Sequence, residues 1–167
     1  MPATAIFQAA IQRLSCLGRA LAPPVMRIAL ALPFLRSGLT RWDPFPSLSA
    51  ATQYLFEEVF MLHLFGRTYP LPAPGLLAWA TAAAELLLPT LLLLGLGTRL
   101  AALGLLAMTA TIQLVVPDGW VNFHLYWAAL ALGVIALGPG MLSIDHWIAR
   151  ASVPRGRLSP KGQPTPR

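Results

Sequence analysis

The sequence is poor in cysteine and in charged residues, and each shortage excludes a class of function. Cys16 is the only cysteine among 167 residues. One chain therefore cannot form an internal disulfide or a CxxC redox pair, nor supply four thiolates to a zinc or iron–sulfur centre. Charged residues make up 11% of the chain and hydrophobic residues 56%, whereas about a quarter of a soluble domain is charged. This balance predicts a small integral membrane protein.

The charges that are present are mostly basic. Twelve Lys and Arg residues against six Asp and Glu residues give a net charge of +6. A basic chain can bind nucleic acid, but here the basic residues lie beside apolar segments, where they bind anionic headgroups and set topology. We therefore expect the lipid bilayer as a partner and no nucleic acid. The N-terminus lacks the ordered basic, apolar and small-residue regions of a cleavable signal peptide.

Four apolar segments approach or reach the length that a helix needs to cross a bilayer, about 20 residues. They cover residues 25–42, 75–97, 100–116 and 120–137. The connections after the second and third are so short that they force antiparallel neighbours. The sequence therefore predicts an all-α, four-transmembrane-helix bundle with amphipathic interfacial helices, in a membrane domain over residues 25–150.

The N-terminal residues 1–24 form an amphipathic helix in this interpretation. Apolar side chains recur at three- and four-residue steps, with basic and amide side chains mostly opposite them. Such a helix can lie on the membrane surface, or it can pack on the end of the bundle, and both readings stay open. We expect Pro23 and Pro24 to end the helix, because proline lacks a donor and restricts the residue before it.

Four further segments lie between or beyond the spans. Residues 47–65 predict a second interfacial helix, and the prolines of residues 70–74 a stiff, extended connector. Ser143 is expected to cap a short amphipathic helix. The tail, residues 151–167, is rich in proline and basic residues, and we expect it to be disordered.

Basic residues are divided unequally between the two ends of this bundle. With four spans both termini share one side, and that side carries eight of the basic residues: Arg13, Arg19, Arg99, Arg150, Arg155, Arg157, Lys161 and Arg167. Only Arg41 and Arg67 lie clearly on the other. The positive-inside rule then places both termini in the cytoplasm of a bacterial inner membrane.

Lone polar residues inside the spans are the best indication of a site. Glu85 lies near the middle of the second apolar segment, while Arg36, Gln113 and His124 fall in the outer half of the other three, counting about 1.5 Å of depth per residue. Because lipid penalises each of them, they should turn inward. The result is a polar pocket open towards the outer face, with Glu85 at its floor. Trp127 adds aromatic surface to these candidate ligand-binding residues.

A purely structural role for the same residues is an equal alternative. A pair of Arg36 with Glu85 could lock two helices together, and Gln113 and His124 could serve as interhelical hydrogen-bonding groups. No metal site is predicted, because the His and Met residues on the outer side show no ligand spacing.

Several motifs taken together resemble the DoxX family of small bacterial membrane proteins. They are RIALALPFLRSGL (residues 27–39), ELLLPTLLLLGLGTRLAA (85–102), GPGMLSID (138–145) and the pattern Pro117…Trp120…His124…Trp127. The resemblance implies a four-helix bundle distantly similar to quinone-reactive, disulfide-forming membrane enzymes. The cysteine pairs of those enzymes are missing here, so dithiol oxidation is not expected.

Two functions follow from the resemblance and the pocket. The first is a quinone-associated accessory subunit of a redox complex, in which Arg36 and His124 donate hydrogen bonds to a quinone head group or similar small ligand. Another protein would then carry the electrons, because this chain shows no haem, flavin or iron–sulfur motif, and no covalently bound cofactor is expected. The second is a membrane scaffold or small-solute carrier without redox chemistry. The sequence leaves the oligomeric state open.

Overall fold

A computed structural model describes residues 3–152, and the tail predicted to be disordered lies almost wholly outside this range. The helices are α1 Ala3–Leu39, α2 Ala50–Tyr54, α3 Pro74–Leu94, α4 Thr98–Val115, α5 Leu125–Leu137 and α6 Ile144–Ala151, and the strands are β1 Met61–Leu64 and β2 Arg67–Pro70. Single π-helical turns precede β1 (Leu55–Val59) and α5 (Trp120–His124), and a 3₁₀ turn (Pro117–Gly119) follows α4.

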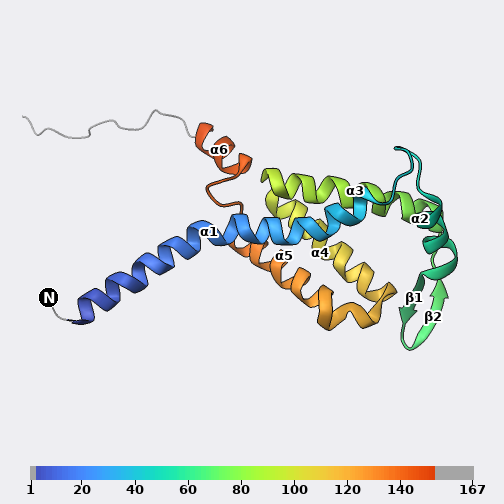
Figure 1. The fold of residues 1–167 in the computed structure, drawn as a ribbon, viewed down its shortest axis with the longest axis horizontal. Helices are drawn as coiled ribbons and strands as arrows, with labels where there is room; N and C mark the ends of the chain where they lie inside the picture. Colours follow the sequence, from blue (N-terminus) through green and yellow to red (C-terminus); the bar gives the residue numbers. More distant parts are fainter. Residues whose placement is uncertain (1–2, 153–167) are drawn as a thin grey trace, which may run out of the picture.

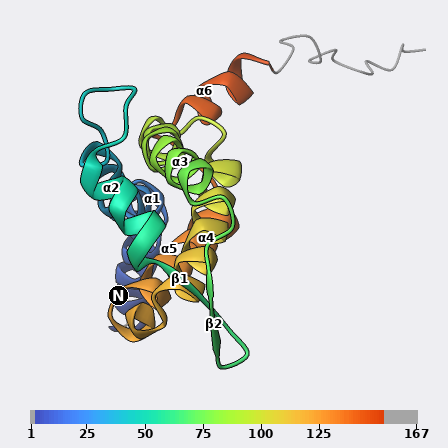
Figure 2. The same cartoon turned by 90° about the vertical axis from the view of Figure 1, so that its right-hand side faces the viewer.

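Four helical segments of the described chain are long and apolar enough to cross a membrane: Ile6–Leu39, Pro74–Leu94, Thr98–Val115 and Pro117–Leu137. The prediction of an all-α bundle with four candidate spans is thereby confirmed. Helix α3 packs mainly on α1, and α4 mainly on α5. Figures 1 and 2 show the two ends of the bundle. We call them the hairpin end, which carries β1 and β2, and the turn end, which carries the α3–α4 turn and α6.

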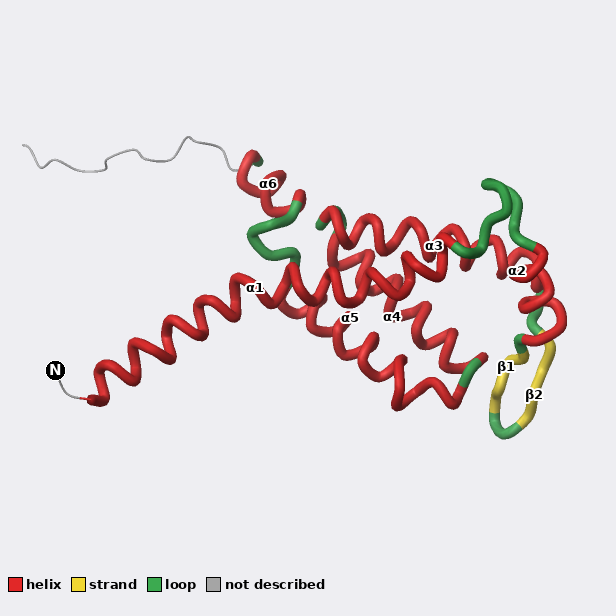
Figure 3. Tube along the Cα trace, in the orientation of Figure 1, coloured by secondary structure: helices red, strands yellow, loops and turns green. Residues whose placement is uncertain are grey.

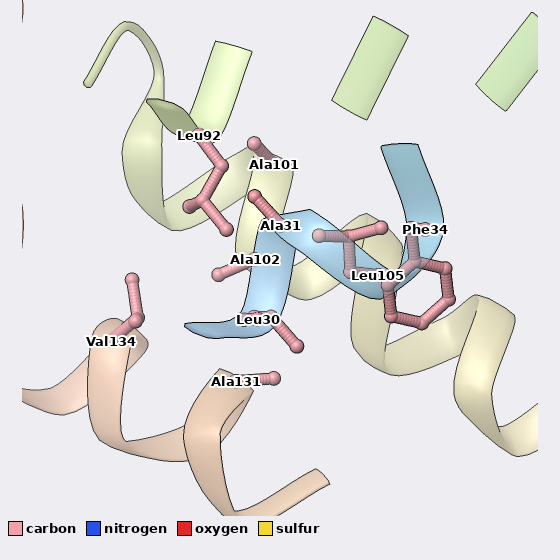
Figure 4. Close-up of a cluster of buried hydrophobic side chains, with 9 residues drawn as sticks. All are labelled: Leu30, Ala31, Phe34, Leu92, Ala101, Ala102, Leu105, Ala131 and Val134. Carbon is pink, nitrogen blue, oxygen red and sulfur yellow. The ribbon is translucent and has the colours of Figure 1, made fainter. Parts of the chain in front are cut away.

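The core of the bundle is built from small and branched apolar side chains (Figure 4). Its buried members are Leu30, Ala31, Phe34, Leu92, Ala101, Ala102, Leu105, Ala131 and Val134. Four of them are alanines, and small residues let helix backbones approach closely where lipid offers no hydrophobic drive for association. The core lies around the C-terminal third of α1, which packs against α3 and α5.

The expected end of the first helix at Pro23 and Pro24 is wrong, because α1 continues through both prolines and through Pro33 to Leu39. Figures 1 and 3 show a change of direction where α1 enters the bundle. Proline is tolerated in helices of this kind where neighbours satisfy the freed backbone groups. Before this bend, the described side chains up to Arg19 are exposed, so the N-terminal part of α1 does not pack on the bundle.

The expected second amphipathic helix is only half right. Ser49 caps α2, and its hydroxyl accepts a hydrogen bond from the amide of Thr52. The helical segment ends at Val59, and the chain then forms the antiparallel pair β1–β2. A two-residue turn joins the strands, and both of its residues, Phe65 and Gly66, have positive φ. Such a turn matches strand twist and favours a hairpin, but a Phe at its first position is a weak sequence signal.

At the turn end, buried Arg27 ties three segments together. Its Nε donates to the carbonyl of Leu92, and its Nη2 to that of Leu93, both at 2.9 Å. These carbonyls lie in the last turn of α3, where the regular helical donors run out, and that of Leu92 also accepts from the amide of Gly95 at the C-cap. Its Nη1 donates to the carbonyls of Pro139 and Leu142. The guanidinium therefore satisfies backbone acceptors of α3 and of the α5–α6 loop at once.

Asp145 completes this junction from α6. Its two carboxylate oxygens accept hydrogen bonds from the amides of Gly97 and Thr98, each at 2.8 Å. Burial by itself raises the pKa of Asp145, but the hydrogen bonds from Thr98 and Gly97 and the charge of Arg27 outweigh it, so the pKa lies below its usual value. The expected cap by Ser143 is also present, because its hydroxyl accepts from the amide of His146.

Candidate functional site

A buried ion pair joins the turn just after α1 to α3, in the half of the bundle nearer the hairpin end. Glu85 is 2% exposed. Its two carboxylate oxygens accept from Nε and Nη2 of Arg41, with Nη2 lying 2.9 Å from Oε1. Such a bidentate arginine–carboxylate pair has two parallel charge-assisted hydrogen bonds, which are stronger than hydrogen bonds between neutral groups. The expected partnership of Arg36 with Glu85 is therefore wrong, because Arg41 takes that place.

Arg41 reaches Glu85 because the chain beyond α1 folds back on itself. Its backbone carbonyl accepts from the amide of Ser49, at 2.9 Å, and from the hydroxyl of Thr52. Its Nη2 also lies 3.3 Å from the hydroxyl oxygen of Ser37. The ring of Phe56 lies under the guanidinium, 5.5 Å from its carbon to the ring centroid, which adds a cation–π contact. The start of α2 therefore positions the arginine.

Gly38 allows the close approach of α1 and α3 that this pair needs. A Cβ atom at this position would lie 2.8 Å from the backbone carbon and oxygen of Glu85. Real Cβ atoms do not come so close to backbone, so a larger residue would push the two helices apart. Arg41 follows three residues later, in the turn after α1, where its backbone amide donates to the carbonyl of Gly38.

A mainly apolar cavity of about 250 Å³ lies beside this pair. Its walls come from α1, α3, α4 and Trp127 of α5, and Phe56, Phe60 and Leu71 cover it at the hairpin end. The lining residues are Pro33, Phe34, Ser37, Arg41, Phe56, Phe60, Leu71, Leu77, Thr81, Glu85, Met108, Thr111, Ile112, Val115, Val116 and Trp127. Its charged groups are Arg41 and Glu85. Of the two charged residues that the sequence placed in the pocket, Glu85 lines the cavity and Arg36 does not.

Of the other predicted site residues, one lines the cavity, two lie behind its aromatic wall and one lies outside it. Trp127 lines it and packs on Phe34, with ring centroids 5.0 Å apart. Gln113 and His124 hydrogen-bond to each other through Oε1 and Nδ1 at 2.6 Å. The His124 ring packs on Trp127, so this pair supports the aromatic wall from behind rather than lining the cavity. Arg36 is exposed and does not line it.

Arg41 is the charged cavity residue that sequence reasoning missed. By position it reads as an interfacial arginine just beyond a span, which is a common place for a residue that sets topology. Ser37 and Gly38 carry the available signal, because a glycine in an apolar helix permits a close contact and the small hydroxyl lies one turn before Arg41. That signal does not reveal which arginine turns inward.

The fold and this site define a small, helical membrane protein with a buried ion pair beside an apolar cavity. A model of the DoxX family matches residues 22–118. The chain belongs to the DoxX family. The matched region includes Arg27, Arg41 and Glu85, so both the turn-end junction and the ion pair involve family-matched sequence. No curated protein and no solved structure matches the chain.

Proposed function

We propose that this chain is a quinone-associated accessory subunit of a redox complex in the bacterial inner membrane. One observation carries the proposal: an apolar cavity inside a membrane bundle that contains a single buried charge pair, Arg41–Glu85. Ligand sites are mainly apolar with a few placed polar groups, and about 300–1,000 Å³ is usual. A cavity of about 250 Å³ suits a head group rather than a whole lipid-soluble molecule.

The chain's own groups supply what a quinone carbonyl oxygen needs. Nε and Nη2 of Arg41 are engaged, whereas its Nη1 has no hydrogen-bond partner among residues 3–152. Thr81 lines the cavity one helical turn before Glu85. Its hydroxyl group makes no hydrogen bond to the described part of the chain. In this proposal Arg41 and Thr81 donate to the ligand, and Glu85 holds or releases a proton. A partner protein carries the electrons.

Orientation belongs to the same proposal. The excess of basic residues at the turn end and in the tail favours a cytoplasmic location for that end, and hence for both termini. The cavity then opens in the periplasmic half of the bilayer. A reporter active only in the cytoplasm, fused after Arg167, should give signal, and activity of a periplasmic reporter there would reverse the placement of the cavity.

Binding can be measured by titrating the purified protein with a soluble quinone analogue and following tryptophan emission. Trp127 lines the cavity, so the wild type should show saturable quenching, and a Trp127→Phe variant should lose most of that signal. Ile112→Phe places a larger side chain in the cavity and should abolish binding. Leu114→Phe is its matched control, because Leu114 lies on the same helix, is exposed, and is not a lining residue.

A membrane scaffold or small-solute carrier without redox chemistry is the second candidate. The observation in its favour is the saturation of both Glu85 oxygens by Arg41, which suits a lock between helices as well as a ligand site. The two candidates differ in one variant. If Glu85 serves the ligand, a folded Glu85→Gln variant binds the analogue with altered affinity. Equal affinity in that variant, or absent quenching in the wild type, leaves the scaffold or carrier as the better account.

A further inference from the structure

The cavity lies along the interface between α3 and α4, which we call the seam. This seam is tightly packed near the turn end and widens towards the hairpin end. The two helices leave the turn at Gly95 and Gly97 side by side, and Figure 1 shows them diverging towards the hairpin end. Their close contact is at Gly104, where a Cβ atom would lie 2.9 Å from Cδ1 of Leu88. A residue with a side chain does not fit there without moving Leu88, so this contact is the base of the widening.

Beyond this contact, towards the hairpin end, the facing residues of the two helices line the cavity. On α3 they are Glu85 and Thr81, three and seven residues before Leu88. On α4 they are Met108 and Thr111, four and seven residues after Gly104. These spacings keep them on the seam face of each helix. The cavity therefore occupies the space between α3 and α4, with α1 behind it.

The two sides of this cavity differ in how well they are covered. At its back Phe34 is buried, and at the hairpin end Phe56 is 7% exposed and packs edge-to-face on Phe60, with ring centroids 5.2 Å apart. Leu71 completes that apolar cover. Along the seam, by contrast, Thr111 is exposed although it lines the cavity. The cavity is thus covered by hydrophobic side chains towards the hairpin end, and at Thr111 its lining meets the lateral surface of the bundle.

We propose that the ligand enters this cavity sideways from the lipid, between α3 and α4. We define the lateral portal as Leu77, Thr81, Thr111 and Val115, which line the cavity on the two facing helices. The proposal rests on the proposed function only in requiring that the cavity takes a ligand. The chemical class that fits is an amphipathic molecule with a hydrogen-bonding head group and a hydrocarbon tail. The head group contacts the Arg41–Glu85 pair, while the tail stays in the portal and the surrounding lipid.

The apolar cover explains why this route is favoured over entry through the hairpin end. A polar head group that crossed Phe56, Phe60 and Leu71 would lose its hydration before reaching any donor. A ligand already dissolved in the bilayer has no such barrier at the portal, where the hydroxyls of Thr81 and Thr111 lie on the way to Glu85. A water-soluble, strongly charged solute is accordingly excluded from both routes.

Photolabelling of the protein in lipid nanodiscs tests the route directly. The probe is a benzoquinone whose alkyl tail carries a diazirine, with an unlabelled tailed benzoquinone as competitor. We expect competable labelling on the portal segments of α3 and α4. Competable labelling on the cover, at Phe60 or Leu71, would overturn lateral entry while leaving the ligand site intact. Absence of any competable labelling, together with absent tryptophan quenching, would overturn the ligand site itself, and the portal with it.

Rates give a second measurement with a matched control. Thr111→Trp narrows the portal and should slow both association and dissociation of the tailed benzoquinone by about tenfold or more, an effect that appears in rates before affinity. Thr90→Trp makes the same change at an exposed position of α3 outside the cavity and should leave both rates unchanged. Phe60→Ala opens the cover at a residue that lines the cavity, so the lost contact should speed dissociation, but lateral entry predicts that association is not faster. Faster association in Phe60→Ala, with no effect of Thr111→Trp, would place the entrance at the hairpin end.

Discussion

The Arg41–Glu85 pair gives the most decisive test of this structure. Glu85 is 2% exposed, and the Arg41 side chain is 14% exposed, so both charges lie largely outside water. Removing one member of a buried pair leaves the other uncompensated and costs about 3–5 kcal/mol. Arg41→Gln and Glu85→Gln should therefore each lower the free energy of unfolding by roughly that amount.

The double variant Arg41→Gln/Glu85→Gln carries no unpaired charge and should recover part of the loss. Two residues in direct contact show coupling energies of about 0.5–3 kcal/mol, and the two-pronged geometry puts this pair near the upper end. Reversible unfolding in mixed micelles, followed by circular dichroism, measures all four proteins of the cycle.

Arg36→Gln is the matched control, because Arg36 is the neighbouring arginine of α1 but is exposed and makes no ion pair in the described chain. Its effect should stay within about 0.5 kcal/mol, as for most surface changes. The reasoning fails if the two single losses simply add in the double variant, or if Arg36→Gln costs as much as Arg41→Gln.

Two further predictions concern the contacts that hold the bundle together. Asp145→Asn weakens the carboxylate cap on the first amides of α4 and should cost about 1–3 kcal/mol. Because the folded pKa of Asp145 lies below its usual value, the wild-type contribution is complete above the ordinary carboxyl pKa of about 4 and is lost as the pH falls through the folded value; unfolding curves of the Asn variant should lack this dependence. Gly38→Ala places a Cβ against the backbone of Glu85 and should cost about 1–3 kcal/mol. Gly18→Ala meets open space and should be neutral or gain up to about 1 kcal/mol in helix propensity. Equal effects of the two glycine changes would contradict the close approach at Gly38.

The sequence by itself determined the class of protein and the burial of Glu85 within the bundle. Apolar length and scarce charge specify four candidate spans, because only helices satisfy their backbone groups inside lipid. A lone carboxylate in such a span has to turn towards protein, and this placed Glu85 inside the bundle. The cap at Ser143 was also predictable, because capping depends on local sequence.

The tertiary structure decided which groups meet. Local rules end a helix at Pro23 and Pro24, yet α1 continues through both and changes direction where it enters the bundle. Counting depth along a straight span pairs Glu85 with Arg36. The chain beyond α1 instead folds back onto α2 and turns Arg41 inward, while Arg36 lies on an outward face. That choice depends on the contact of Gly38 with the distant Glu85 and on the fold-back of Ser49 onto Arg41, and such contacts leave no periodic pattern in the sequence.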